Sequence, residues 1–212
     1  MELRYYSNIN AENMLNEILH RRDDTPHGKT WEEWTAKWWQ WILSIPKTHN
    51  PVYDTSGEKS YYSLNNENVV FLAGTAGGKA VRRVTIPSGR SILLPVINCT
   101  TSYAENPSLK TEAEMFAFVQ SNIDDIRHKS ASIYGLDVVN LENYRVRSGV
   151  FKVTFPENNI FNAEAGDTIG VSDGYWLFMK PFRVGSHSIR TFGSCLSGRI
   201  TIDVAYNIIV KE

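Results

Sequence analysis

The amino-acid sequence predicts a mainly β protein, a single antiparallel β-sandwich of jelly-roll type with about three peripheral helices. Apolar and polar residues alternate along residues 200–210, as they do in a strand with one face in the core. Almost everything after Ser132 continues in β patterns. Only three stretches show helical spacing, and a sandwich with helices packed outside it accommodates that mixture.

Three stretches have the apolar spacing of helices: residues 11–22, 30–45 and 111–128. The second and third begin with a capping box, in which a threonine and a glutamate three residues later satisfy the first backbone N–H groups. Pro46 ends the second helix. The capping residues are Thr30 with Glu33 and Thr111 with Glu114. The apolar stripes of the first and third helices are Met14, Leu15, Ile18 and Leu19, and Met115, Phe118, Val119, Ile123 and Ile126.

The middle helix carries five tryptophans in eleven residues. At about 100° per residue, four of them share one stripe with Ile42 and Ile45, which predicts a helix that covers one sheet or one open end of the sandwich. Trp39 lies about 100° from the stripe centre, so it either packs under the N-terminal helix or is available to a ligand or a second subunit. The four tryptophans on the stripe are Trp31, Trp34, Trp38 and Trp41.

The remaining residues show strand patterns separated by turns. Residues 74–78 are predicted to form a hairpin turn between apolar runs. The parity of the apolar residues changes near residues 148–149, which predicts a β-bulge. Residues 200–210 form the clearest strand of the chain.

The length of 212 residues suits one β-rich domain. Residues 1–29 are predicted to form an N-terminal helical extension, and residues 30–212 the β-sandwich domain with the tryptophan-rich helix. No repeat, linker or shift in composition marks a second domain. A chain of this length buries roughly 70% of its unfolded surface, so it needs no disulfide or metal to fold.

The charge of the chain excludes two classes of partner. The 22 Lys+Arg and 23 Asp+Glu residues give a net charge of −1, whereas a generic nucleic-acid binder has a clustered basic excess. Nothing attracts the chain to an anionic membrane, and no stretch is apolar enough to cross one. The sequence therefore predicts no nucleic-acid partner and no membrane partner, while a homo-oligomer stays open.

The N-terminal residues predict the compartment. Residues 1–6 lack the basic and apolar regions of a secretory signal. Cys99 and Cys195 lie far apart without metal-type spacing, and in a chain without a signal they are expected to be free, buried thiols. The predicted location is cytoplasmic.

Short motifs follow one another along residues 30–210. They are WEEWTAKWWQW (31–41), FLAGT (71–75), IPSGR (86–90), LPVIN (94–98), DGYW (173–176) and GSHSI (185–189). In this order and spacing they resemble a widespread family of uncharacterised, often secreted bacterial β-sandwich proteins. The resemblance covers nearly the whole chain and supports the fold, but the family has no established activity to carry over.

Two departures from that family agree with a cytosolic protein. Many members begin with a signal peptide and carry cysteines near the positions of Ser60 and Val84. This chain has neither feature, which fits a version that stays in a reducing compartment. A chain trimmed of its signal is the alternative, although residues 1–29 have the pattern of a native helix.

The sequence supports no cofactor and no metal site. The glycines at 74–78 lack the first Gly and the Ser or Thr of a phosphate-binding loop, and a strand rather than a helix follows them. The five histidines show no paired spacing typical of metal ligands. No serine stands in a G-x-S-x-G motif, and Cys195 could act as a nucleophile only with a base beside it.

His187 is the histidine most suited to chemistry. Asp173, Tyr175 and Arg190 are close to it in the sequence and are expected on adjoining strands. A histidine oriented by a carboxylate, with a tyrosine and an arginine nearby, can perform general acid–base catalysis, so these four are the candidate catalytic residues. The alternative is a buried histidine satisfied by one hydrogen bond, with Asp173 and Gly174 in a hairpin turn.

Trp39 and Trp176 are the candidate ligand-binding residues. An available aromatic ring stacks on a sugar or another flat ligand at low entropic cost. The alternative for the tryptophans is burial of the helix stripe against a sheet, which the stripe geometry already explains.

Two functions follow from these residues. The first is a non-catalytic module that binds a small molecule, such as a carbohydrate, or interacts with another protein. The second is a small-molecule enzyme (an isomerase, lyase, cyclase or hydrolase) that uses the four candidate catalytic residues at the mouth of the sandwich. The second requires His187 and a carboxylate to share one concave pocket.

Overall fold

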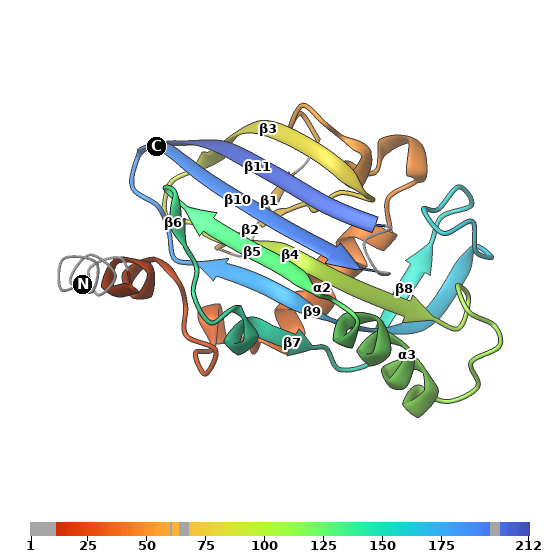
Figure 1. Ribbon diagram of the computed structural model, residues 1–212. Helices are drawn as coiled ribbons and strands as arrows, with labels where there is room; N and C mark the ends of the chain where they lie inside the picture. Colours follow the sequence, from red (N-terminus) through yellow and green to blue (C-terminus); the bar gives the residue numbers. More distant parts are fainter. Residues whose placement is uncertain (1–11, 60, 64–67, 196–199) are drawn as a thin grey trace.

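The computed structural model describes residues 12–59, 61–63, 68–195 and 200–212. Two β-sheets face each other, and helices lie at their periphery (Figure 1). Sheet A has the strand order β1-β2-β4-β9-β7, with β8 also paired to β9, and sheet B has the order β3-β11-β10-β5-β6. The prediction of a mainly β, sandwich-like protein with about three helices is confirmed for these residues.

Each element is bounded as follows. Residues 12–18 are helical, and the longer helices are α2 (Trp31–Leu43) and α3 (Glu112–Asp124). Short 3-10 turns are η1 (Pro26–Gly28), η2 (Lys47–His49), η3 (Pro51–Tyr53) and η4 (Leu141–Tyr144). Sheet A contains β1 (Tyr61–Ser63), β2 (Val69–Leu72), β4 (Ser91–Ser102), β7 (Arg145–Arg147), β8 (Phe151–Phe155) and β9 (Gly166–Met179). Sheet B contains β3 (Gly78–Pro87), β5 (His128–Ile133), β6 (Leu136–Asp137), β10 (Gly185–Cys195) and β11 (Ile200–Lys211).

Sheet A is buried on both faces because its strands alternate between two apolar layers. On β9, Tyr175 and Leu177 face sheet B, whereas Trp176 and Phe178 face α2. The pleated backbone of a strand makes successive side chains point to opposite faces of the sheet. A strand that is covered on both faces therefore has an almost continuous apolar sequence. The inner layer is completed from sheet B by alternate residues of β11, such as Val204.

The helix α2 covers the outer face of sheet A, as its tryptophan stripe predicts. Trp31, Trp34 and Trp38 are at most 1% exposed, and Trp38 meets Trp176 edge-to-face at 5.2 Å between ring centroids. The capping box of Thr30 is present, and so is that of Thr111 on α3. The helix α3 packs beside the end of β4 and β9 (Figure 1).

The prediction of purely antiparallel pairing is wrong for two strand pairs. β2 pairs with β4 in parallel, and β3 pairs with β11 in parallel. β2 and β4 lie in sheet A, and β3, which comes between them in the sequence, lies in sheet B. The chain reverses its direction before β3 and again before β4, so β2 and β4 run in the same direction. Residues 74–77 consequently form a crossover between the sheets and not the predicted hairpin turn.

The change of parity near residues 148–149 coincides with one extra residue on the edge of sheet A, as the predicted bulge requires. Arg147 and Phe151 are four residues apart, whereas their partners on β9, Asp173 and Gly170, are three apart. The extra residue lies at the break between β7 and β8, which pair with separate parts of β9.

A second register shift, which the sequence did not predict, lies on β4 between Pro95 and Ile97. Val96 and Ile97, at this shift, both belong to the inner core, and both line a cavity at the end of the sandwich.

Residues 12–29 pack against the end of the sandwich. Leu15 and Leu19 belong to the inner core, whereas Met14, which was expected on the same stripe, is 45% exposed. Leu19 forms a β-bridge with Met179. The N-terminal extension therefore shares the core of the β-sandwich instead of standing apart from it.

Candidate functional site

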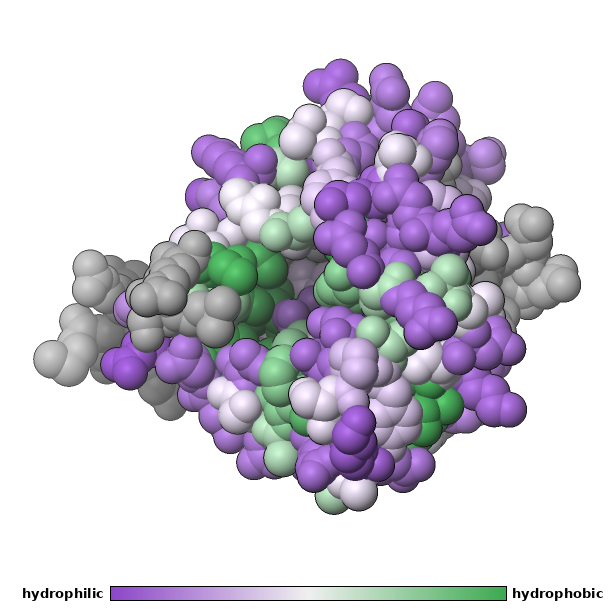
Figure 2. Space-filling view, turned by 90° about the vertical axis from the view of Figure 1, so that its right-hand side faces the viewer, coloured by the Kyte–Doolittle hydropathy of each residue, from purple (hydrophilic) through white to green (hydrophobic). Residues whose placement is uncertain are grey.

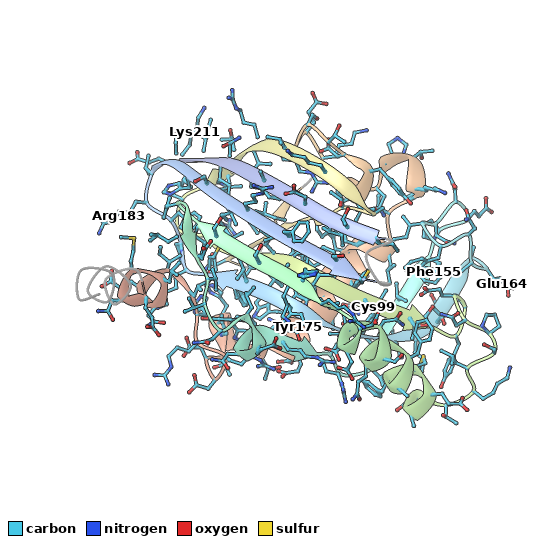
Figure 3. The ribbon with its side chains drawn as sticks, viewed as in Figure 1. Cys99, Phe155, Glu164, Tyr175, Arg183 and Lys211 are labelled. Carbon is cyan, nitrogen blue, oxygen red and sulfur yellow. The ribbon has the colours of Figure 1, made fainter. Side chains whose placement is uncertain are left out.

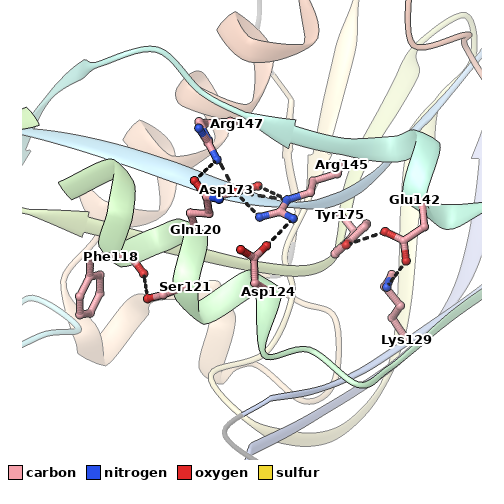
Figure 4. Close-up of polar contacts among 10 residues, drawn as sticks. All are labelled: Phe118, Gln120, Ser121, Asp124, Lys129, Glu142, Arg145, Arg147, Asp173 and Tyr175. Carbon is pink, nitrogen blue, oxygen red and sulfur yellow. Dashed lines mark hydrogen bonds and ion pairs between the residues drawn. The ribbon is translucent and has the colours of Figure 1, made fainter. Parts of the chain in front are cut away.

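Asp173 is buried in the middle of β9 and is held by two arginines. The Nε and Nη2 atoms of Arg145 donate to its carboxylate at 3.0 and 2.7 Å, and Arg147 lies 3.7 Å away (Figure 4). Arg145 also reaches Asp124 on α3 at 2.7 Å. These bonds to Asp173 raise the pKa of Arg145. The Asp173 carboxylate thus ties β9 to β7, and it does not occupy a hairpin turn.

Tyr175 belongs to a second polar cluster on the same strand. Its hydroxyl donates to Glu142 at 2.8 Å, and Glu142 pairs with Lys129 at 2.6 Å (Figure 4). Lys129 also lies over the tyrosine ring, 4.3 Å from its centroid. Burial, followed by the bond to Glu142, raises the pKa of Tyr175, so the phenol loses its proton less readily than a free tyrosine.

His187 lies at the other end of the molecule. Its Nε2 atom is 2.6 Å from the carbonyl of Arg183, and Nδ1 contacts the Tyr134 hydroxyl. Its ring stacks on Phe182, with 4.6 Å between centroids. Arg183 and Cys99 mark the two ends of the sandwich (Figure 3), and Asp173 pairs in register with Cys99.

The four candidate catalytic residues are therefore not brought together. Asp173 and Tyr175 are on sheet A, and His187 and Arg190 are on sheet B, so they do not lie on adjoining strands as expected. Arg190 is exposed and pairs with Asp203 at 2.9 Å. Because each residue is bonded to a different partner, the structure contains no shared acid–base site among them.

The two candidate ligand-binding tryptophans differ in their accessibility to a ligand. Trp176 is fully buried between sheet A and α2, so a ligand cannot stack on it. Trp39 is 7% exposed and lines a cavity. Of the two, only Trp39 is available to a ligand, which is one of the two roles that its position outside the helix stripe predicts.

The cavity has a volume of about 420 Å³ and lies at the end of the sandwich near Cys99. It reaches the surface, because two of its lining residues, Tyr53 and Ile200, are 46% and 37% exposed. The view onto this end shows a hollow bordered by hydrophobic surface (Figure 2). Its walls come from α2 (Trp38, Trp39, Ile42), β4 (residues 95–100), α3 (Phe118, Asn122, Ile123) and β11 (Ile200, Ile202).

β4 forms the rear wall of this end cavity because its neighbour β2 is short. The pairing of β2 with β4 stops at Phe71 and Leu93. Beyond that point, within the described residues, β4 pairs only with β9. The six consecutive residues 95–100 can therefore all line the cavity.

Three polar side-chain atoms in the cavity wall have no hydrogen-bond partner among the described residues. They are Nε1 of Trp39, Nδ2 of Asn98 and Oε2 of Glu105. Buried polar groups without partners are uncommon, because each costs free energy that a hydrogen bond would recover. Burial raises the pKa of Glu105 to about 8. An apolar cavity with a few convergent polar groups is the usual form of a small-molecule site.

The two cysteines also line the cavity, and both are free thiols, as predicted, but they are half-buried and not fully buried. Burial, with Glu105 nearby, raises the pKa of the Cys99 thiol to about 12. Burial also raises the pKa of Cys195. Because the thiolate is the nucleophilic form, neither cysteine is activated for covalent catalysis.

One further group of residues, which no sequence pattern indicated, surrounds the hydroxyl of Ser91. Nε2 of His20 and Nε2 of His27 lie 3.3 and 3.0 Å from Oγ of Ser91, and Nδ1 of His20 lies 3.6 Å from Asp24. The contacts are those of a Ser-His-Asp set, but Ser91 is fully buried. A substrate cannot reach the hydroxyl, so the set holds residues 12–29 against β4.

Two further features, a metal site and a membrane-spanning helix, are absent from the described residues. No group of three or more His, Cys, Asp or Glu side chains in the described part of the chain could hold a metal ion. None of the helices described is long and apolar enough to cross a membrane.

No known family model matches the chain, and no curated protein matches it. A match to a solved structure, the cysteine protease inhibitor EhICP2 from Entamoeba histolytica, has a TM-score of 0.23 and 11% identity, and covers 64% of this chain and 88% of that one. A similarity of this size establishes neither a common fold nor a common activity.

Proposed function

We propose that this protein is a non-catalytic binding protein whose end cavity holds one small, mainly apolar molecule. The observation that carries the proposal is the set of three unpartnered polar atoms, on Trp39, Asn98 and Glu105, in the wall of an otherwise apolar cavity. Apolar walls supply the free energy of binding, and a few polar groups fix the orientation of the ligand.

The composition of the wall argues against a carbohydrate, which the sequence left open as the ligand. A sugar carries several hydroxyl groups, and each loses free energy if it is buried without a hydrogen bond. The wall contains few polar side chains, and one of them, Thr100, already donates to the Val171 carbonyl at 2.9 Å. An aliphatic or aromatic molecule with one polar end fits the wall better.

No observation favours the enzyme over the binding protein. The end cavity contains none of the four candidate catalytic residues, and its thiols are protonated at neutral pH, as described above. The jelly-roll connectivity, the bacterial family, the cytoplasmic location and the homo-oligomer remain predictions.

Binding of the neutral dye Nile red, followed by its fluorescence, tests the proposal. Thr75 lies in the crossover loop and lines the cavity, so Thr75→Trp places an indole in the cavity without replacing a strand residue. We expect this variant to bind the dye at least tenfold more weakly than the wild type.

The matched control is Thr85→Trp, at an exposed position on β3. It should bind the dye as the wild type does. Absence of binding in the wild type, or equal binding by all three proteins, would refute a ligand site in this cavity. Displacement of the dye by sugars but not by aromatic molecules would instead identify a carbohydrate-binding protein.

A further inference from the structure

The hydrogen-bonding character of the end cavity restricts the ligand further. Trp39 Nε1 can only donate a hydrogen bond, and the Nδ2 atom of Asn98 is also a donor. Trp39 is more than nine-tenths buried, so a missing hydrogen-bond partner costs more free energy here than at the surface. Both groups require an acceptor atom on whatever occupies the cavity.

Charge gives the second restriction. No lysine, arginine or histidine is among the described residues that line the cavity. Apart from Glu105, its titratable groups are the thiols of Cys99 and Cys195 and the phenol of Tyr53. None of these supplies a positive charge, so a ligand carboxylate or phosphate would be buried without a counter-ion, which is costly.

Glu105 completes the set as a third donor. With its pKa raised to about 8 by burial, its carboxyl group is mostly protonated at neutral pH, and a protonated carboxyl has an O–H group to donate. Ketosteroid isomerase, in which an apolar site keeps an aspartic acid neutral as a donor, is a known precedent for this use.

We propose, on the basis of the function proposed above, that the ligand is an uncharged molecule with a hydrocarbon body and a carbonyl oxygen, as in a ketone, ester or amide. The carbonyl accepts hydrogen bonds from Trp39, Asn98 and Glu105, and the hydrocarbon part contacts the apolar wall. An ammonium group would pair with Glu105 alone and would leave the two N–H donors facing its own hydrogens.

Four probes of similar size separate these possibilities: ethylbenzene, acetophenone, 1-phenylethylamine and phenylacetate. Calorimetric titration of the full chain at pH 6.5 should give acetophenone an affinity about tenfold above each of the other three, because one hydrogen bond is worth up to about tenfold in affinity. Raising the pH to 9.5 ionises Glu105 and should weaken acetophenone binding severalfold.

Two variants identify the groups responsible. Trp39→Phe keeps most of the ring and removes the N–H donor, so it should weaken acetophenone binding severalfold and leave ethylbenzene binding unchanged. Glu105→Gln keeps a donor that does not ionise, so its acetophenone affinity should be the same at both pH values.

The outcomes distinguish this inference from the proposed function. Tightest binding of the amine or the carboxylate, or equal binding of ethylbenzene and acetophenone, would overturn the carbonyl ligand and leave the cavity as a binding site. If none of the four probes nor Nile red binds, the proposed function itself fails.

Discussion

The fold buries the Oε2 atom of Glu105 without a hydrogen-bond partner among the described residues. The pKa of Glu105 rises from 4.5 to about 8 on folding, so between these values the folded chain holds a proton that the unfolded chain releases. The free energy of unfolding therefore falls as the pH rises from about 4.5 to 8, and becomes level above that. A residue that destabilises its own fold at neutral pH is typical of a functional site.

Glu105→Gln should consequently raise the midpoint of thermal unfolding at pH 7.5, and the gain should shrink toward pH 4.5. Thermal unfolding between pH 4.5 and 8.5 measures both effects. Glu164→Gln, at an exposed position, is the control and should leave the profile unchanged. A gain independent of pH would show that Glu105 is ionised in the folded chain.

Arg82 is a cation that lies fully buried on β3. Its guanidinium donates to the carbonyls of four residues and to the Tyr206 hydroxyl, over 2.5–3.1 Å. It thereby fixes η3 and the crossover loop, both of which border the end cavity. The four residues whose carbonyls accept are Pro51, Asp54, Ala73 and Gly74.

Arg82→Lys keeps the charge but loses the planar fork of donors, so several buried carbonyls lose their partners. We expect a loss of about 3 kcal/mol in the free energy of unfolding, measured by urea denaturation. The neighbouring exposed Arg83→Lys should change it by less than about 0.5 kcal/mol. Equal small effects at both positions would show that the fork is not needed.

At the scale of elements, the two sheets approach each other closely where Gly193 of β10 faces Ile97 of β4. A Cβ atom at position 193 would lie 2.6 Å from the Cβ of Ile97, which is far inside van der Waals contact. The absence of a side chain here lets β4 come close to sheet B, and Ile97 itself lines the end cavity.

Gly193→Ala should therefore force β10 and β4 apart and lower the free energy of unfolding by about 1–3 kcal/mol. Chemical denaturation checks this value. Gly149→Ala is the matched control, because no atom lies within 4 Å of an added Cβ there, and it should be close to neutral. If Gly193→Ala also leaves the free energy of unfolding unchanged, β10 and β4 can accommodate the added methyl group and the close approach does not constrain this position.

At the scale of the whole molecule, local patterns were predictable and long-range arrangement was not. Periodicity and capping boxes predicted α2 and its buried tryptophans, because helix amphipathicity depends on residues three or four apart. Alternation also identified β11. It carries no information on strand direction or on which sheet a strand joins, so the parallel pairs and the separation of Asp173 from His187 were missed.

The end cavity itself was not predicted, but Trp39, which lines it, was named as a candidate ligand-binding residue. The position of Trp39 off the helix stripe was a signal that the helix has a second contact. Glu105 gave no signal, since a single glutamate in a loop is ordinarily solvated. Glu105 lies between β4 and α3 and lines the cavity together with residues of both elements, a tertiary arrangement that no local pattern encodes.

The attachment of residues 12–29 gives the whole molecule a response to acid. Backbone bonds of 2.8 Å from His20 to the Phe178 carbonyl and 2.7 Å from Lys180 to the Ile18 carbonyl join this segment to β9. Burial lowers the pKa of His20 below 6.5, and Lys180 and His27 act in the same direction while Asp24 opposes them. The folded state thus prefers the neutral ring, so the stabilisation is complete above pH 6.5 and is lost as the pH falls through the folded pKa.

Acidification should therefore loosen this segment before the sandwich unfolds. The amides of His20 and Lys180 should exchange faster at pH 5 than at pH 7.5, after correction for the intrinsic rates, while amides of β11 stay protected. His20→Gln should remove most of this pH dependence, whereas His128→Gln, at an exposed position on β5, should keep it. Unchanged protection at pH 5, or an undiminished pH dependence in His20→Gln, would show that His20 does not control the docking of residues 12–29.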